Sequence, residues 1–534
     1  MNLNFPSLTE YESVFLETLS FLDRQQVPER IWKKDYKLWS QHPAEVANRL
    51  GWLDVMNSMR KEIPELKTFG DKIRQDGTSD VVLLGMGGSS LGAEVLNRTF
   101  GNEKGYPQMT VLDSVIPEAV NSVSESIDPA KTQFLVSSKS GTTAETRALF
   151  DYFYALEIDN CGPEAGQHFT VITDRGSPLE ILGREKNIRR IFDNPEELGG
   201  RYSVLSYFGL VPAVTLGIDV EELLSGADAI RMKCGPDVKA EDNDGCRLGA
   251  YLAVLAKKSR DKVTFITSPS LDDFSLWAEQ LIAESTGKNG KGLIPVVGEP
   301  QVEGDLYGID RQFVYLRSKD SDNGMIDSFI KQVTSSGQPV AMVEIENKLE
   351  LGALFYLWEF AVAIAGMLIG VQPFNQPDVQ SSKDATKRIL EKYEKTGQLP
   401  SVEVRKSFYD MLSQAKENDY FAIMAYLQQT PRTDSVFYEL RRRVLKNYKL
   451  ATTLGYGPRF LHSTGQLHKG GPNKGLFLQV VSDSYKDILI PGRSYSFGTM
   501  SDAESLGDLE ALRSLNRSVV RVALDSSHID DILE

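Results

Sequence analysis

Residues 133–146 read QFLVSSKSGTTAET, and residues 81–92 read VVLLGMGGSSLG. In both stretches a short apolar run gives way to a loop of small and hydroxyl residues, and a helical pattern follows the loop. An unbroken apolar run of this length is typical of a parallel strand that helices cover on both faces. Each stretch therefore predicts a strand, then a loop at the carboxyl edge of a parallel sheet, then a helix.

Similar apolar runs recur along the chain, at intervals that leave room for a helix between them. Three more lie in the first half, and three follow a helical passage near residues 203–232. The six are MTVLD (109–113), HFTVIT (168–173), RRIFD (189–193), KVTFITS (262–268), QFVYLRS (312–318) and PVAMVEI (339–345). Strands that alternate with helices indicate βαβ units. We therefore predict an α/β protein with two tandem, doubly wound parallel-sheet domains.

The two ends of the chain have a different texture. The first 75 residues look helical and contain no glycine-rich loop. After a charged helix from Lys383 to about Gly397, apolar runs at 421–427, 476–481 and 518–524, with a helix at 435–448, indicate a further α/β unit. The expected organisation is an N-terminal helical arm (1–75), a first sheet domain (76–235), a second sheet domain (236–397) and a C-terminal α/β domain (398–534).

Composition narrows the class of protein. The chain carries 59 basic and 74 acidic residues, a net charge of -15, which disfavours binding to nucleic acid. Three scattered cysteines, Cys161, Cys234 and Cys246, argue against a disulfide framework and against a zinc site. The N-terminus lacks a basic region followed by an apolar run, so no signal peptide is expected and the cytoplasm is the expected location.

One stretch is long enough to cross a membrane. Residues 354–371 read LFYLWEFAVAIAGMLIGV, but Glu359 lies within them and no comparable second stretch exists. A helix that is apolar nearly all round is also typical of a large α/β core. We therefore predict a buried helix and no membrane contact.

Residues 137–146, the hydroxyl loop, offer six hydroxyl groups and one lysine at the start of a helix. Hydroxyls, free N–H groups and an ammonium together suit a phosphate dianion, whereas an ordinary helix cap needs a single hydroxyl. Residues 85–92, the glycine loop, allow a ligand to approach the backbone closely. Ser90 stands where a dinucleotide-binding loop needs glycine, and a Walker lysine is missing, so a plain strand-to-helix turn stays open for this loop.

Together the two loops resemble those of the sugar isomerase (SIS) fold, and three further blocks narrow the resemblance to the phosphoglucose isomerase family. These blocks are ELGGRYSVLSYFGL (197–210), AEQLIAESTGK (278–288) and GMLIGVQPFNQPDVQSSK (366–383). All five blocks occur in the family's order. The isomerase half of transaldolase–isomerase fusions is similar too, and no transaldolase portion is visible in these 534 residues. The resemblance implies interconversion of glucose 6-phosphate and fructose 6-phosphate, as in glycolysis and gluconeogenesis, without a metal or a nucleotide cofactor.

The resemblance also assigns roles to residues. Glu284 would carry a proton between adjacent sugar carbons through a cis-enediol. Arg201 would stabilise the enediolate oxygen, and Lys383 would help to open the pyranose ring. Taken alone, the three residues have plainer readings: a surface glutamate, a structural arginine and a solvated lysine. The remaining expected substrate contacts are Gly88, Ser89, Gln280 and Gln376 on the sugar side, and Ser138, Lys139, Ser140 and Thr143 at the phosphate.

At one point the chain departs from the family's pattern. The family's ring-opening histidine lies between the base and the final lysine, and this chain has no histidine between Glu284 and Lys383. Residues 457–473, GPRFLHSTGQLHKGGPN, carry His462 and His468 on a glycine-bounded stretch that we call the histidine segment. We expect it to fold over the cleft and supply the imidazole, whose pKa of about 6.5 suits proton exchange near neutrality. A structured turn is the alternative reading of this segment.

The source of the imidazole bears on oligomeric state. The resemblance implies a homodimer in which the histidine comes from the partner subunit, whereas the extra C-terminal domain offers one from the same chain. Both arrangements stay open at this point. Two rival functions stay open as well: a dual isomerase that also accepts mannose 6-phosphate, and a non-catalytic phosphosugar-binding regulator, which would keep the hydroxyl loop and lose the base.

Overall fold

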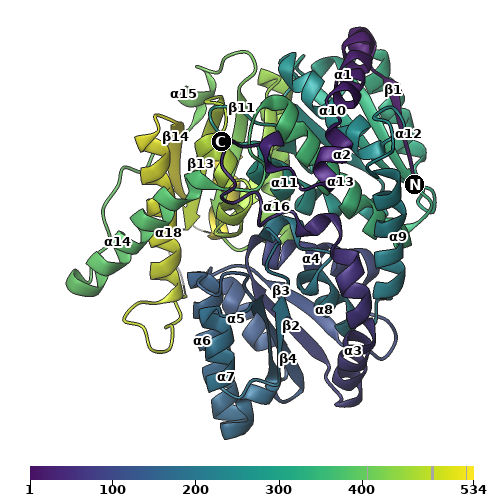
Figure 1. The fold of residues 1–534 in the computed structure, drawn as a ribbon. Helices are drawn as coiled ribbons and strands as arrows, with labels where there is room; N and C mark the ends of the chain where they lie inside the picture. Colours follow the sequence, from purple (N-terminus) through teal and green to yellow (C-terminus); the bar gives the residue numbers. More distant parts are fainter. Residues whose placement is uncertain (406, 483–485, 525, 534) are drawn as a thin grey trace.

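The computed structural model describes residues 1–405, 407–482, 486–524 and 526–533, and its fold is α/β (Figure 1). Its first sheet is entirely parallel, with strand order β3-β2-β4-β5-β6. The strands are β2 (Asp80–Gly85), β3 (Gln108–Leu112), β4 (Thr132–Ser137), β5 (Phe169–Asp174) and β6 (Arg190–Asn194). The five strands predicted for this region are therefore confirmed.

The order of this sheet places the two loops together. From β2 the chain turns to β3 on one side and later returns to β4 on the other, so β2 and β4 are neighbours with Gly85 opposite Ser137. The glycine loop and the hydroxyl loop therefore leave the sheet side by side, at the kind of switch point where parallel sheets bind ligands. The helices of this part are α4 (Leu91–Phe100), α5 (Pro117–Ser126), α6 (Ala144–Cys161), α7 (Pro178–Glu185), α8 (Tyr207–Thr215) and α9 (Val220–Lys233).

The second sheet has the order β1-β10-β9-β7-β8. Its strands are β7 (Lys262–Thr267), β8 (Ile294–Val296), β9 (Arg311–Ser318), β10 (Val340–Ile345) and, antiparallel at the edge, β1 (Asn2–Ser7). The N-terminal arm is thus helical only after its first residues, with α1 (Glu12–Arg24), α2 (Val27–Trp32) and α3 (Val55–Gln75). Strands β1 and β8 were not predicted, whereas β7, β9 and β10 were.

A third parallel sheet, of order β12-β11-β13-β14, forms the C-terminal part of the fold. Its strands are β11 (Tyr420–Tyr426), β12 (Ala451–Tyr456), β13 (Gly475–Ser482) and β14 (Ser518–Leu524), and of these only β12 was not predicted. Its helices are α15 (Tyr409–Leu412), α16 (Pro431–Tyr448), α17 (Gly465–Gly470) and α18 (Phe497–Ser514). From these three sheets we propose that the chain divides into four parts, with boundaries at residues 75, 235 and 397.

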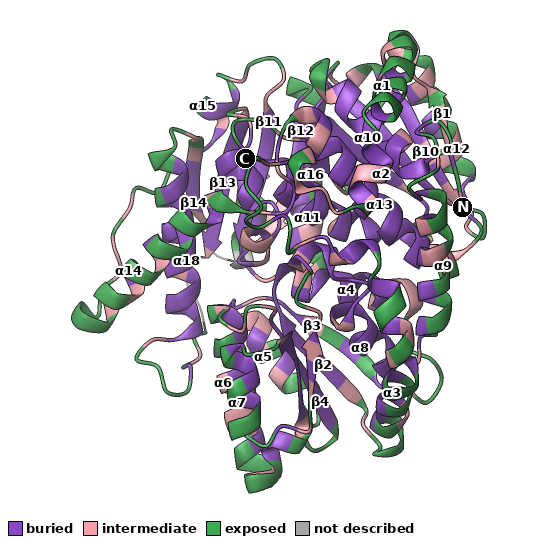
Figure 2. Ribbon diagram, viewed as in Figure 1, coloured by how far each residue is buried: buried purple, intermediate pink, exposed green. Residues whose placement is uncertain are grey.

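The apolar stretch forms a central core helix. α13 (Leu351–Ile369) packs between α9, α10 (Asp244–Lys257) and α11 (Phe274–Thr286), and nearly all of its residues are buried (Figure 2). In the part of the chain that the structure describes, one helix, Lys348–Ile369, is long and apolar enough to cross a membrane, and 89% of its apolar window is buried. The prediction of a buried helix is confirmed. The second domain is completed by α12 (Gly324–Ser335) and α14 (Gln380–Thr396).

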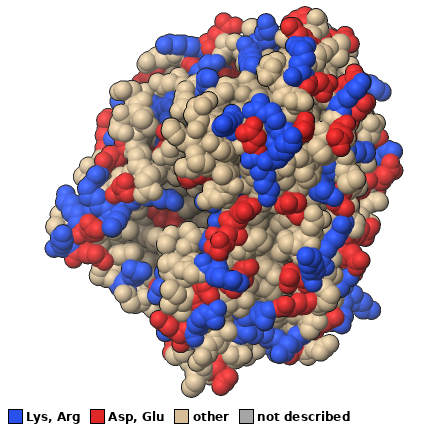
Figure 3. All heavy atoms as spheres, in the orientation of Figure 1, with Lys and Arg blue, Asp and Glu red and all other residues tan. Residues whose placement is uncertain are grey.

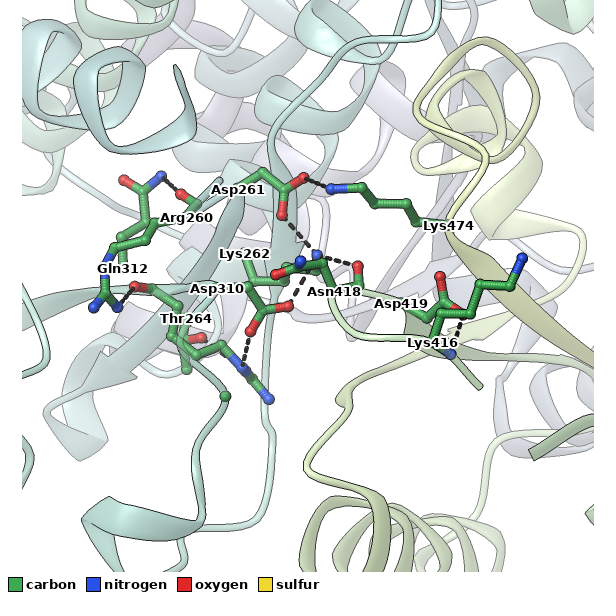
Figure 4. Close-up of polar contacts among 12 residues, drawn as sticks. Arg260, Asp261, Lys262, Thr264, Asp310, Gln312, Lys416, Asn418, Asp419 and Lys474 are labelled. Atoms are coloured by element: carbon green, nitrogen blue, oxygen red, sulfur yellow. Dashed lines mark hydrogen bonds and ion pairs between the residues drawn. The ribbon is translucent and has the colours of Figure 1, made fainter. Parts of the chain in front are cut away.

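A buried lysine joins the second and third sheets at their amino ends (Figure 4). Lys262 has no exposed surface, and its Nζ lies 2.7 Å from Asp261 Oδ1 and 3.0 Å from Asp310 Oδ2. Its third contact crosses to the C-terminal domain, where Nζ donates to the main-chain oxygen of Asn418 at 2.6 Å. A buried ammonium needs such partners, because an unpaired one is strongly destabilising. The network fixes the C-terminal domain, whose opposite end carries the histidine segment.

Candidate active site

The glycine loop is the point where three parts of the chain meet. Gly87 has a φ of +56°, and a Cβ built there would lie 2.5 Å from the main-chain oxygen of His462. A Cβ on Gly88 would lie 2.3 Å from the oxygen of Gly200, directly before Arg201. Only glycine permits such close backbone approach. The loop therefore packs the histidine segment and the stretch Gly200–Arg201 against the first sheet, and Ser89 within the loop is buried.

The hydroxyl loop opens into a cavity of about 540 Å³. Ser140, Thr142 and Thr143 line it, and Ser138 Oγ lies 3.1 Å from Thr143 Oγ1. Thr143 is the N-cap residue of α6 but its side chain makes no capping hydrogen bond. The Thr143 side chain therefore leaves the first N–H groups of α6 uncapped, although the N–H of Glu145 interacts with the carboxylate of the same residue.

Lys139 lies differently from what the sequence predicts. Its Nζ pairs with Asp174 at the end of β5, and the backbone N–H of Asp174 donates to the oxygen of Lys139 at 3.1 Å. The side chain does not line the cavity. The hydroxyl residues Ser140, Thr142 and Thr143, rather than this ammonium, line the cavity from the first domain.

Positively charged side chains from α14 and from the stretch before α18 also line the cavity. Lys383 and Lys387 of α14 line it, together with Arg493 and Tyr495 from the stretch before α18. Figure 3 shows Lys and Arg side chains gathered over the protruding end of α14, and a hollow between this protrusion and the first domain. The lining also contains acidic residues, namely Glu145, Asp384, Glu391, Glu394 and Glu504, so its charge is mixed. The lysine and arginine side chains are the groups that suit an anionic ligand.

His462 links the C-terminal domain to the first domain. Its side chain lines the cavity, and its Nε2 lies 2.6 Å from Oε1 of Glu145, the second residue of α6. Burial raises the pKa of Glu145, but the charge and hydrogen bond of His462, with a contribution from Lys383, outweigh it and hold this pKa below its ordinary value. Glu145 is therefore an ionised partner for the imidazole.

His468 occupies another environment. It is 4% exposed, and its ring lies 5.8 Å from that of Phe460 and 5.0 Å from that of Phe477. Burial, with the nearby charges of Lys469 and Arg517, holds the pKa of His468 well below its ordinary value. Of the two predicted histidines, only His462 lies on the cavity.

The predicted base belongs to a connected polar cluster. Glu284 on α11 is 6% exposed and accepts a hydrogen bond from Gln280 Nε2 at 3.2 Å. The same nitrogen donates to the main-chain oxygen of His462 at 2.8 Å. Arg201 Nη1 lies 3.4 Å from Glu284 Oε2 and donates to Gln376 Oε1 at 3.0 Å. The base, the arginine, both glutamines and the histidine segment are thus brought together.

Two anchors hold the histidine segment in this position. At its start, Arg459 Nε lies 2.5 Å from Asp113 Oδ2, directly after β3, and Arg459 also faces Glu94 at 3.8 Å. Further along, Gln466 donates to Asp378 Oδ2 at 2.5 Å and accepts from the backbone N–H of the same residue. The segment therefore touches the first domain at one end and the loop after Gln376 at the other.

Glu145 is the cavity residue in contact with His462 that the sequence analysis did not single out. It lies within the hydroxyl loop, in SSKSGTTAET, but its carboxylate was not distinguished from an ordinary first-turn acid that favours a helix start. Its partner lies 317 residues away, and no local pattern connects the two.

The chain is similar to proteins of one described family. A family model described as "Phosphoglucose isomerase" matches residues 43–293. Glucose-6-phosphate isomerase of Streptococcus mutans is 30% identical over 392 residues, which is 63% of this chain and 86% of that protein. The enzyme of the same name from Rubrobacter xylanophilus is 30% identical over 381 residues, 61% of this chain and 86% of that protein.

Two solved structures share the fold. A hypothetical protein from Thermus thermophilus, TT0462, has a TM-score of 0.62 at 25% identity and covers 72% of this chain and 99% of its own. A glucose-6-phosphate isomerase from Chlamydia trachomatis has a TM-score of 0.58 at 18% identity, covering 73% of this chain and 88% of its own. The second likeness concerns the fold alone.

Proposed function

The chain belongs to the phosphoglucose isomerase family, and we propose that it interconverts glucose 6-phosphate and fructose 6-phosphate. The observation that carries the proposal is the position of Glu284, which contacts Arg201 and Gln280 and is linked through Gln280 to His462 on the cavity of the hydroxyl loop. A carboxylate beside a fixed cation suits proton transfer next to a carbonyl.

Substrate binding begins with the phosphate. The dianion accepts hydrogen bonds from the first N–H groups of α6 and from the hydroxyls of Ser140, Thr142 and Thr143. The positive end of the helix dipole favours the same charge. Binding at this end of the cavity leaves the sugar ring toward His462 and Lys383.

Opening of the pyranose ring is assigned to His462 and its partner Glu145. The imidazole of His462 gives a proton to the ring oxygen, the C1 hydroxyl gives its proton to solvent, and the C1–O5 bond breaks to leave an aldehyde. Glu145 holds the imidazole in position through this contact. Lys383 lines the same cavity and places a positive charge near the oxygens that gain electron density.

Isomerisation follows on the open chain. Glu284 takes the proton from C2, the electron pair forms the C1–C2 double bond, and the carbonyl oxygen becomes an enediolate oxygen. The Arg201 guanidinium stabilises that negative charge. A proton moves between the two oxygens, and Glu284 returns its proton to C1 to give the ketose. General acid–base catalysis of this kind contributes about 10²–10⁴-fold in rate.

The site is proposed to be complete within one chain, because His462 and Glu145 meet in the same polypeptide. A homodimer is then not required for the chemistry. All three cysteines are free, which fits the proposed cytoplasmic location, where thiols are kept reduced.

A coupled assay tests the function. The protein is incubated with fructose 6-phosphate, and glucose 6-phosphate is removed by its dehydrogenase. We expect steady turnover, and no product with mannose 6-phosphate in place of fructose 6-phosphate. Turnover of both would identify a dual isomerase. Binding of fructose 6-phosphate without any turnover would identify a regulator and contradict the proposal.

A further inference from the structure

Three potential metal ligands converge at the amino end of the first sheet, away from the cavity. Glu157 and Cys161 lie in the last turns of α6, and His168 directly precedes β5. Glu157 Oε2 is 3.3 Å from His168 Nδ1 and 3.5 Å from Cys161 Sγ. The three ligand atoms all lie within 4.8 Å of one another.

The two separations from Glu157 Oε2 match the corresponding edges of a zinc tetrahedron. With Zn–O and Zn–N bonds of about 2.0–2.1 Å and a Zn–S bond of about 2.3 Å, an O···N edge is about 3.3 Å and an O···S edge about 3.5 Å. Thiolate and imidazole ligands favour zinc over harder cations such as Mg²⁺ and Ca²⁺, which favour oxygen ligands. We propose that Glu157, Cys161 and His168 bind one Zn²⁺ ion, with a water in the fourth position.

A second observation concerns Glu157. Its side chain has no exposed surface, and its Oε1 has no hydrogen-bond partner among the described residues. Oε2, not Oε1, is the oxygen that faces His168 and Cys161, so an ion bound there would offset the buried negative charge of the carboxylate and not the missing partner of Oε1. The simple alternative is a hydrogen-bonded triad, in which His168 Nδ1 donates to Thr132 O at 3.2 Å and Cys161 donates to Glu157. That alternative leaves the buried carboxylate without a cation beside it.

The sequence analysis did not identify this cluster, because the three cysteines lie far apart in the chain. Glu157 and Cys161 are four residues apart on a helix and so share one face, while the fold returns His168 to them. Access from solvent is available, because Cys161 is half-buried and the His168 side chain is 22% exposed. The ion would tie the end of α6 to the start of β5. Since the opposite end of α6 carries Thr143 and Glu145, the site supports the active-site helix without touching substrate.

The test is metal binding by the full-length protein after dialysis against a chelator. Zn²⁺ is titrated in competition with a chromogenic indicator, and we expect one ion per chain. Cys161→Ser and His168→Gln should each weaken binding at least about 100-fold, more than the loss of an outer-shell partner does. Glu157→Gln keeps the shape of the side chain and should weaken it as well. His42→Gln, on an exposed histidine of the N-terminal arm, is the matched control and should change nothing.

Spectroscopy identifies the ligand directly. Co²⁺ bound in place of Zn²⁺ should give a sulfur-to-cobalt charge-transfer band that disappears in Cys161→Ser. Absence of stoichiometric binding, or binding that survives Cys161→Ser unchanged, would overturn the proposal and favour the hydrogen-bonded triad. Isomerase turnover is expected to be the same with and without Zn²⁺, so the result is independent of the proposed function.

Discussion

Nε2 of His462 lies 2.6 Å from Oε1 of Glu145, although 317 residues separate the two in the chain. The C-terminal domain thereby places an imidazole on the helix that follows the hydroxyl loop. The family resemblance implied a histidine from a partner subunit; in this structure a histidine of the same chain lies at the cavity. The following predictions test whether this contact is catalytic.

Replacing His462 tests the acid/base assignment. We expect His462→Ala to lower kcat for fructose 6-phosphate by about 10²-fold, because ring opening loses its proton donor. His468→Ala is the comparison: it removes a buried ring between Phe460 and Phe477 and should lower the melting temperature while changing kcat little. Steady-state kinetics and thermal unfolding of both variants provide the measurement. Unchanged kcat in His462→Ala would remove His462 from the mechanism.

Mixing two inactive variants tests whether the site is complete in one chain. We expect a mixture of Glu284→Gln and His462→Ala to stay inactive, because each chain lacks one of its own groups. If the histidine instead came from a partner subunit, mixed dimers would contain one intact site each. Activity would then recover to about a quarter of the wild-type value after subunit exchange. Such recovery would contradict the same-chain arrangement.

Replacing Arg459, which anchors the histidine segment, tests whether this contact positions the imidazole of His462. Arg459→Gln removes the pairing with Asp113 at the start of the four-residue turn that ends at His462. We expect kcat to fall about 10-fold with little change in KM, since the phosphate site is untouched while the imidazole loses its support. Arg442→Gln is a suitable control, because Arg442 lies on α16 of the same C-terminal domain, is 40% exposed and pairs with Glu439 of its own helix. A large rise in KM for Arg459→Gln would show that the arginine acts on substrate binding instead.

Glu359 in the core helix gives a pH-dependent prediction. Burial raises the pKa of Glu359 well above its ordinary value, and neither carboxyl oxygen has a hydrogen-bond partner among the described residues. As the pH rises past the ordinary value, the unfolded chain releases this proton and the folded chain keeps it, so the free energy of unfolding falls. Glutamine cannot titrate and escapes this loss.

Glu359→Gln should therefore gain stability relative to the wild type between about pH 4 and about pH 8. Denaturant unfolding of both proteins at the two pH values measures the difference in their free energies of unfolding. A stability difference that is the same at both would show that Glu359 does not titrate with a raised pKa.

Much of the fold could be predicted from apolar runs. The strands that escaped prediction lack such a run or lie at an edge: β8 has three residues and includes Pro295, β12 carries two threonines and Gly455, and β1 contains Pro6. Periodicity has little to detect in segments of this kind.

The site was predictable to the extent that it lies in local motifs. Arg201, Gln280 and Glu284 come together as the resemblance implied. The pairing of Lys139 with Asp174 could not be predicted, because the acid lies on the next strand. The partner of His462 depends on how the C-terminal domain docks, which no local pattern records.

Proton exchange at C2 tests the central claim most directly. In deuterated water the wild-type enzyme should place solvent deuterium at C2 of glucose 6-phosphate, observed by NMR. Glu284→Gln should show neither exchange nor turnover while still binding a non-isomerisable hexitol phosphate, and Glu279→Gln, the same change on the same helix, should exchange normally. Exchange that persists in Glu284→Gln would contradict the assignment of this carboxylate as the base.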